Sequence, residues 1–125
     1  MRILIVEDSK ERQKQFEANL YTHDITIVET VEDAIKKLSN VIRWDVLFLD
    51  HDLGGQVYVP SDNKDTGYQV AKFLSDNKQY LPYNIIVHSL NYEGAKNILS
   101  LLKEQAMHIP FAWTKENLKR IGLVI

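Results

Sequence analysis

Acidic and histidine side chains follow three short apolar segments of this chain, each at the point where the segment ends. The sequence places Glu7 and Asp8 after residues 3–6, Asp50, His51 and Asp52 after residues 46–49, and His88 and Ser89 after residues 85–87. Carboxylates that converge repel one another and are costly to desolvate, and a hard divalent cation with oxygen ligands relieves both costs. These residue types therefore predict a divalent-metal and phosphate site, with Mg²⁺ or Mn²⁺ as the cation.

The apolar segments have the length and composition of buried β-strands, and helical periodicity lies between them. We expect strands at about residues 2–7, 25–28, 45–50, 84–88 and 109–113. This alternation predicts an α/β fold, a flavodoxin-like three-layer αβα sandwich around a five-stranded parallel sheet in the order 2-1-3-4-5. The carboxyl ends of the strands in such a sheet open into one crevice, which would bring the polar residues together.

Residues with short polar side chains mark the expected starts of the helices. The first helix is predicted at about residues 9–21, with Asp8 and Glu11 spaced as a capping box. The starts of the later helices are predicted at Thr30, Asp65, Asn91 and Thr114.

Composition narrows the class of protein and of partner. A length of 125 residues fits a single domain, residues 1–125. The net charge of −2 leaves no broad basic surface, so we expect no binding to duplex DNA. Without cysteine there is no thiolate metal site. The apolar segments are too short for a signal peptide or a membrane span, which favours a cytoplasmic protein without a membrane partner.

Over essentially its whole length the chain resembles the receiver domain of bacterial response regulators. Glu7 and Asp8 lie where that family has its acidic pair, Asp50 lies where it has the phospho-accepting aspartate, and Ser89 lies at the switch Ser/Thr position. The resemblance implies that Mg²⁺ binds the acidic pair, the acceptor aspartate and a backbone carbonyl two residues beyond, here that of Asp52.

The chain also departs from ordinary receivers. They have a lysine followed by proline after the fifth strand, whereas the nearest lysine here is Lys115, with no proline after it. The loop from Asp50 to Gly67 is roughly twice as long as in ordinary receivers, and His51 and His88 are additional. Three sequence segments, residues 49–54 (LDHDLG), 65–67 (DTG) and 87–94 (VHSLNYEG), are similar to a narrower group, the cyclic-phosphate-processing receiver-like domains. That similarity implies action on cyclic phosphate ends, such as those of cleaved RNA.

The candidate residues divide by role. Asp50 and His88 are the candidate catalytic residues, with His88 moving a proton near neutral pH. The candidate metal ligands are Glu7, Asp8, Asp50 and Asp52. The candidate phosphate-binding residues are Ser89, Asn91 and Lys115, since the start of the fourth helix offers free N–H groups to a phosphate. His51 and Gly94 are accessory candidates.

Several of these assignments have a simpler alternative. Because adjacent residues of a strand point to opposite faces, His51 would point away from Asp50 unless the chain turns at once. Asn91 has a cap of its helix as its simpler alternative, and Gly94 is either a point of close approach or a tolerated helical glycine. The loop at residues 54–61 is either a lid over the crevice, with Tyr58 facing a ligand, or a surface excursion.

Three functions remain open at this stage. The leading one is processing of a cyclic phosphate or related phosphoester, with a phosphate-bearing small molecule or an RNA end as substrate. The second is a stand-alone receiver that a histidine kinase or small phosphodonor phosphorylates on Asp50. The third is a pseudo-receiver that only binds a protein partner.

Overall fold

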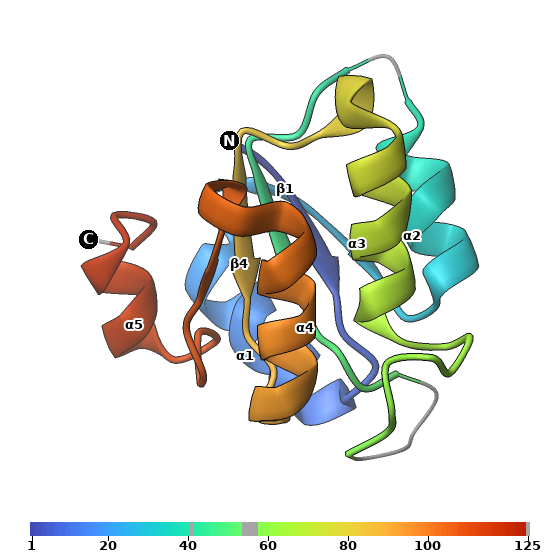
Figure 1. The fold of residues 1–125 in the computed structure, drawn as a ribbon. Coiled ribbons are helices and arrows are strands. Elements are labelled where there is room, and N and C mark those ends of the chain that lie inside the picture. Colours follow the sequence, from blue (N-terminus) through green and yellow to red (C-terminus); the bar gives the residue numbers. More distant parts are fainter. Residues whose placement is uncertain (41, 54–57, 125) are drawn as a thin grey trace.

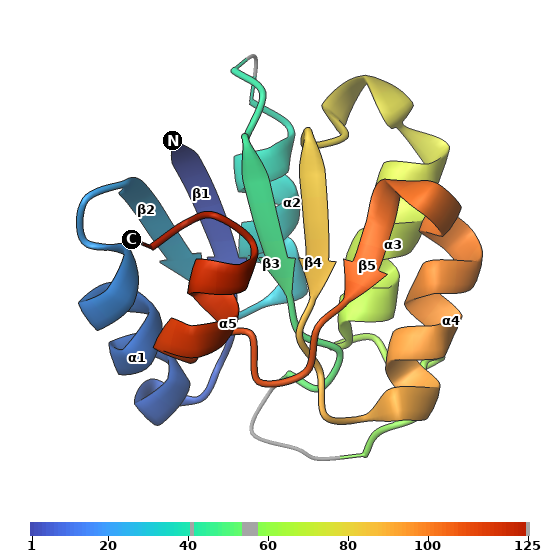
Figure 2. The same ribbon diagram turned by 90° about the vertical axis from the view of Figure 1, so that its left-hand side faces the viewer.

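Five parallel strands form the centre of the molecule. The structure is a computed structural model, and it describes residues 1–40, 42–53 and 58–124. The strands are β1 (Arg2–Val6), β2 (Asp24–Val28), β3 (Val46–Leu49), β4 (Asn84–Val87) and β5 (Ala106–His108). Their order is β2-β1-β3-β4-β5, with every neighbouring pair parallel (Figure 2), which confirms the predicted flavodoxin-like fold.

Helices cover both faces of the sheet (Figure 1). The bounds are α1 (Lys10–Leu20), α2 (Val31–Leu38), α3 (Gly67–Asp76), α4 (Tyr92–Leu102) and α5 (Lys115–Arg120), with 3₁₀ turns η1 (Lys78–Tyr80) and η2 (Lys103–Gln105). One apolar core joins the sheet to α2, α3 and α4, and a second joins it to α1 and α5. No helix in the described ranges is long and apolar enough to cross a membrane.

Alternation along the strands decides which core each side chain enters. In β1, Leu4 and Val6 belong to the core under α2, α3 and α4, whereas Ile3 and Ile5 belong to the core under α1 and α5. By the same period of two, Glu7 continues the row of Ile3 and Ile5. Asp50 and His88, the residues that follow β3 and β4, lie on the same face. Each comes two positions after a residue of the core under α1 and α5, namely Phe48 and Ile86.

The last strand differs from its prediction. The expected strand at residues 109–113 is wrong, and β5 instead spans Ala106–His108. Ile109 still donates its N–H to the carbonyl of Val87, but Pro110 has no N–H to offer, and Phe111 adopts a positive φ of 59° that no strand has. The apolar composition of this segment reflects packing by Trp113, which is buried, rather than strand pairing.

Two of the predicted helix starts are also shifted by one residue. The N-cap of α1 is Ser9, whose Oγ accepts from the N–H of Arg12 at 3.4 Å, so the capping box of Asp8 and Glu11 is wrong. The N-cap of α3 is Thr66 rather than Asp65. The other three caps are confirmed, since in each the side chain accepts an N–H of the first turn: Thr30, Asn91 and Thr114.

Candidate metal and phosphate site

Three side chains from three strands meet at the carboxyl edge of the sheet. Glu7 directly follows β1, Asp50 follows β3 and His88 follows β4. Each of the three side chains offers one ligand atom, and these atoms lie within 4.8 Å of one another. All three residues are buried. Two carboxylate oxygens and one imidazole nitrogen at this spacing fit a divalent cation, and the imidazole makes the set less suited to Mg²⁺ than a purely oxygen set would be.

Burial and neighbouring charge act differently on the two carboxyl groups. Burial opposes ionisation of Glu7, but the hydrogen bond and charge of His88, the N–H of Ser9 and the Arg12 guanidinium outweigh it and lower the pKa of Glu7 to about 2. Burial raises the pKa of Asp50 to about 7; the charge of Glu7 adds to this, and His88, Arg12 and the N–H of His51 oppose it. One carboxylate and one carboxyl near half-protonation therefore share the site at neutral pH.

The ring of His88 presents one nitrogen to the cluster and one to an apolar wall. Its Nε2 lies 3.0 Å from Oε1 of Glu7, and because a carboxylate only accepts, Nε2 donates. Aromatic rings surround the rest of the imidazole at centroid distances of 5.4 Å for Phe16, 6.3 Å for Phe48 and 5.9 Å for Trp113. Among the described residues Nδ1 has no hydrogen-bond partner. Only Nε2 is therefore placed to act on a ligand in the cluster.

Arg12 supplies the positive charge at this site, and the sequence analysis missed it. Its Nη1 lies 3.4 Å from Oε1 of Glu7 and 3.5 Å from Oδ2 of Asp50. The guanidinium also stacks on Trp113, with Cζ 4.9 Å from the ring centroid. Its side chain is 28% exposed, so Arg12 reaches from solvent into the cluster. The available signal was its position in the first turn of α1, next to the capping residue Ser9.

Lys115, the predicted phosphate-binding lysine, differs from Arg12 in its exposure and its ion pairs. It is the first residue of α5 and is exposed. In the described part of the chain Lys115 forms no ion pair, whereas Arg12 forms two. The cation beside the acidic cluster thus comes from the helix after β1, and not from the segment after β5 as in ordinary receivers.

The other two predicted metal ligands lie outside the cluster of three. Asp8 is half-buried beside the cap of α1. The carboxylate of Asp52 is used within the protein: it lies 2.7 Å from Nδ1 of His51, accepts from the backbone N–H of Tyr58 at 2.6 Å and accepts from Nδ2 of Asn91 at 3.1 Å. The side chain of Asp52 therefore holds the long loop, whereas its carbonyl stays a predicted ligand.

His51 and Gly94 form a contact of their own on the other face of the sheet. His51 is fully buried and lies against α4, where a Cβ on Gly94 would come within 2.4 Å of its Cγ. Gly94 is thus the close-approach glycine that one alternative described, but the group it admits is the His51 ring rather than a ligand. The period of two along β3 explains why His51 points away from Asp50.

The two polar residues before α4 bond to one another and to the loop. Ser89 is buried, and its Oγ accepts from the N–H of Asn91 at 3.0 Å. Asn91 caps α4 by accepting from the N–H of Gly94 at 2.9 Å, and its Nδ2 donates to the carbonyl of Val59 at 3.3 Å. Residues 54–57 of the proposed lid lie outside the described residues. Tyr58 is 73% exposed, so its ring is not packed into the site.

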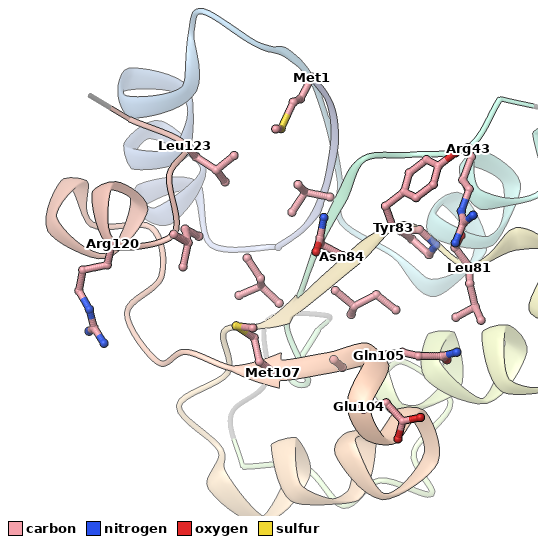
Figure 3. Close-up of a pocket in the computed structure, with 16 residues that line it drawn as sticks. Met1, Arg43, Leu81, Tyr83, Asn84, Glu104, Gln105, Met107, Arg120 and Leu123 are labelled. Carbon is pink, nitrogen blue, oxygen red and sulfur yellow. The ribbon is translucent and has the colours of Figure 1, made fainter.

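A separate cavity lies at the opposite, amino-terminal edge of the sheet (Figure 3). Its volume is about 610 Å³, and it is lined by the starts of β3 and β4 and by side chains such as Arg43, Tyr83 and Met107. Ligands of parallel α/β sheets bind at the carboxyl edge, and the titratable cluster lies there too. Volume alone therefore does not identify the functional site of this molecule.

Solved structures with this fold are receiver domains. The receiver domain of sensor histidine kinase PA1611 from Pseudomonas aeruginosa, with magnesium coordinated in its active-site cleft, is 22% identical over 96% of this chain and 92% of its own, with a TM-score of 0.72. A CheY-like receiver domain from Methylobacillus flagellatus is 20% identical over 97% and 94%, with a TM-score of 0.68. The Mn²⁺-bound response regulator Rcp1 is 18% identical over 96% and 87%, with a TM-score of 0.66.

A search of curated proteins found no match. A family model described as the cyclic-phosphate processing receiver domain matches residues 2–104, which include all three residues of the cluster, Arg12 and His51. The chain therefore belongs to the cyclic-phosphate processing receiver domain family.

Proposed function

We propose that this domain binds Mn²⁺ or Mg²⁺ at the cluster of Glu7, Asp50 and His88 and processes a cyclic phosphate or a related phosphoester there. The observation that carries the proposal is the buried imidazole within ligand distance of two carboxylates. A receiver that only exchanges a phosphoryl group on aspartate needs oxygen ligands alone, so a third, nitrogen donor favours phosphoester chemistry. The name of the family points the same way.

Each residue of the site has a distinct part in this proposal. Glu7 and Asp50 supply carboxylate oxygens, and Nε2 of His88 supplies the nitrogen. Because this nitrogen cannot hold a metal and carry a proton at once, the ligand role replaces the proton transfer expected from the sequence. A bound divalent cation would polarise a phosphoryl oxygen and lower the pKa of a bound water.

Arg12 is the proposed phosphate-binding residue. Its guanidinium is one-quarter exposed and already lies between the two carboxylates, and stacking on Trp113 fixes its plane. A planar guanidinium can bind two oxygens of a phosphate at once. The negative charge that develops on those oxygens during reaction would strengthen this contact.

Turnover of 2′,3′-cyclic nucleotides with Mn²⁺ and with Mg²⁺ tests the proposal. We expect hydrolysis that is faster with Mn²⁺, is lost with EDTA, and falls about 100-fold or more in Asp50→Asn and His88→Ala. The control is Ser75→Ala, since Ser75 lies on α3 away from the cluster. Absence of turnover with either metal, or full turnover in His88→Ala, would contradict the proposal.

The second candidate is phosphorylation of Asp50 itself, as in response regulators. It is favoured by the place of Asp50 directly after β3 in a receiver fold, with Arg12 beside it. Stable ³²P incorporation from acetyl phosphate, abolished by Asp50→Asn, would favour this candidate, and a histidine kinase would then be its partner. The third candidate, a module that only binds protein, predicts no affinity for divalent metal.

A further inference from the structure

A chain of three side chains, Asp52, His51 and Ser61, lies outside the acidic cluster. Oδ1 of Asp52 is 2.7 Å from Nδ1 of His51, and Nε2 of His51 is 2.9 Å from Oγ of Ser61. A carboxylate only accepts, so Nδ1 of a neutral His51 carries the hydrogen and Nε2 accepts from the hydroxyl of Ser61. This is the order of carboxylate, imidazole and hydroxyl that activates a serine nucleophile.

The imidazole at the centre of this chain is fixed in place. The His51 ring lies so close to Gly94 that a Cβ at position 94 would clash with it. Asp52, which orients the ring, is itself held by the N–H of Tyr58 and by Asn91. His51 is completely buried, so water does not compete for its nitrogens. A base held in one tautomer and one orientation needs no reorganisation before it accepts a proton.

The serine is also held by several hydrogen bonds, and the residue is partly exposed. Its carbonyl accepts from Thr66 at 3.3 Å and from Gln69 at 3.2 Å, and its Oγ accepts from Nδ2 of Asn97 at 2.9 Å. Ser61 is half-buried, whereas His51 is not exposed at all. Ser61 and Asp52 are therefore the partly exposed members of the set of three, and His51 is the closed one.

We propose that Ser61 is a nucleophile activated by His51 and Asp52, and that it takes a phosphoryl group from an activated phosphoester. Oγ of Ser61 forms the bond to phosphorus while the bond from phosphorus to the leaving group breaks. The leaving group departs with the bonding electrons, and the hydroxyl proton passes to Nε2 of His51. Asp52 stabilises the resulting imidazolium, and the product is a serine phosphoester.

The side chains of this site are not those of the proposed metal site, although the backbone N–H of His51 donates to Oδ1 of Asp50 at 2.8 Å. His51 packs on α4, whereas His88 packs among aromatic rings on the α1 and α5 face. No step at Ser61 needs a divalent cation. Experiments on Ser61 in the presence of EDTA therefore report on this proposal alone.

A fluorophosphonate probe tests the proposal directly, because its fluoride leaves as Oγ bonds to phosphorus. The folded wild-type protein is incubated with the probe in EDTA, and the adduct is located by peptide mass spectrometry. We expect labelling at Ser61, none at that peptide in Ser61→Ala, and a rate about 100-fold or more lower in Asp52→Asn. Labelling should disappear when the wild-type protein is unfolded in urea before the probe is added.

The matched control is Ser75→Ala, which removes a half-buried serine that contacts no histidine among the described residues and should label like wild type. Melting temperatures confirm that each variant is folded. If folded wild-type protein gives no adduct on Ser61, or if Asp52→Asn labels at the wild-type rate, the proposal is wrong and the three residues serve only to fasten the loop to α4.

Discussion

The two histidines at the carboxyl edge of the sheet have the same exposure and opposite surroundings. His51 and His88 are both fully buried, and they follow the neighbouring strands β3 and β4. Both nitrogens of His51 have partners, in Asp52 and Ser61. His88 has one partner, Glu7, and within the described residues its Nδ1 has none.

This difference places the two rings in different sites: His51 links Asp52 to Ser61, whereas His88 faces the acidic cluster. The nitrogen of His88 that faces the cluster is Nε2, which lies 3.0 Å from Oε1 of Glu7. The fully satisfied ring of His51 instead connects the long loop to α4 through Asp52, Ser61 and Gly94. The exposed fraction of the two rings does not distinguish them, whereas their hydrogen-bond partners do.

The largest expected effect on stability comes from filling the space beside His51. In Gly94→Ala the new Cβ would meet the ring at 2.4 Å, and the hydrogen bonds at both nitrogens prevent the ring from moving. We expect a net loss of about 2–3 kcal/mol in the free energy of unfolding, despite the better helix propensity of Ala. Urea unfolding measures this loss.

The double variant Gly94→Ala/His51→Ala sharpens the test. Removing the ring removes the clash, so the double variant should be more stable than the sum of the two single losses predicts, by more than about 1 kcal/mol. Simple additivity would show that the ring and the glycine are not coupled.

An intermediate effect is expected from Asp50, on the His88 face, as a function of pH. Its folded-state pKa of about 7 exceeds the ordinary value of 3.8, so the folded state keeps a proton that the unfolded chain loses. The stability this contributes is present below about pH 4 and is lost as the pH rises to about 7. Asp50→Asn should therefore be more stable than wild type at pH 8, and nearly equal to it at pH 4.

Urea unfolding in EDTA across this range checks the pH prediction, because EDTA keeps a metal from changing the titration of Asp50. Glu7, whose pKa is lowered to about 2, adds the opposite slope only below about pH 4.5. A constant difference between Asp50→Asn and wild type from pH 4 to 8 would contradict the raised pKa of Asp50.

The smallest effect separates Arg12 from Lys115. Arg12→Met should weaken binding of inorganic phosphate to the Mn²⁺-loaded protein by about tenfold, since it removes a charge-assisted hydrogen bond. Lys115→Met should leave the affinity unchanged, because Lys115 is exposed on α5. Calorimetric titration with phosphate measures both. If both variants lost the same phosphate affinity, Lys115 would bind phosphate as the lysine of ordinary receivers does, and the prediction would be wrong.

The sequence was sufficient to predict most of the fold and the centre of the site. Each buried strand is a dense run of β-branched and apolar residues, so its end could be placed within one residue, and with it Glu7, Asp50 and His88. The period of two along a strand also gave the alternative in which His51, an accessory candidate, points away from Asp50.

What the sequence could not give depends on how the elements pack. Arg12 lies four residues before the buried Phe16, on the same face of α1, but the spacing alone does not show that this end of the helix reaches the acidic cluster. Likewise β5 consists of three residues with a weak preference for strands. The strand was therefore predicted in the more apolar segment that follows it, residues 109–113. The network of Ser61 joins segments far apart in the chain, which spacing alone cannot reveal.

Calorimetric titration with Mn²⁺ at pH 7.5 tests the central assignment most directly. The account predicts that wild-type protein takes up one Mn²⁺ per chain, and that Glu7→Gln, Asp50→Asn and His88→Ala each weaken this binding at least about tenfold, while Ser75→Ala binds as wild type does. If the wild-type protein takes up no Mn²⁺, or if His88→Ala binds it with unchanged affinity, Glu7, Asp50 and His88 do not form a metal site.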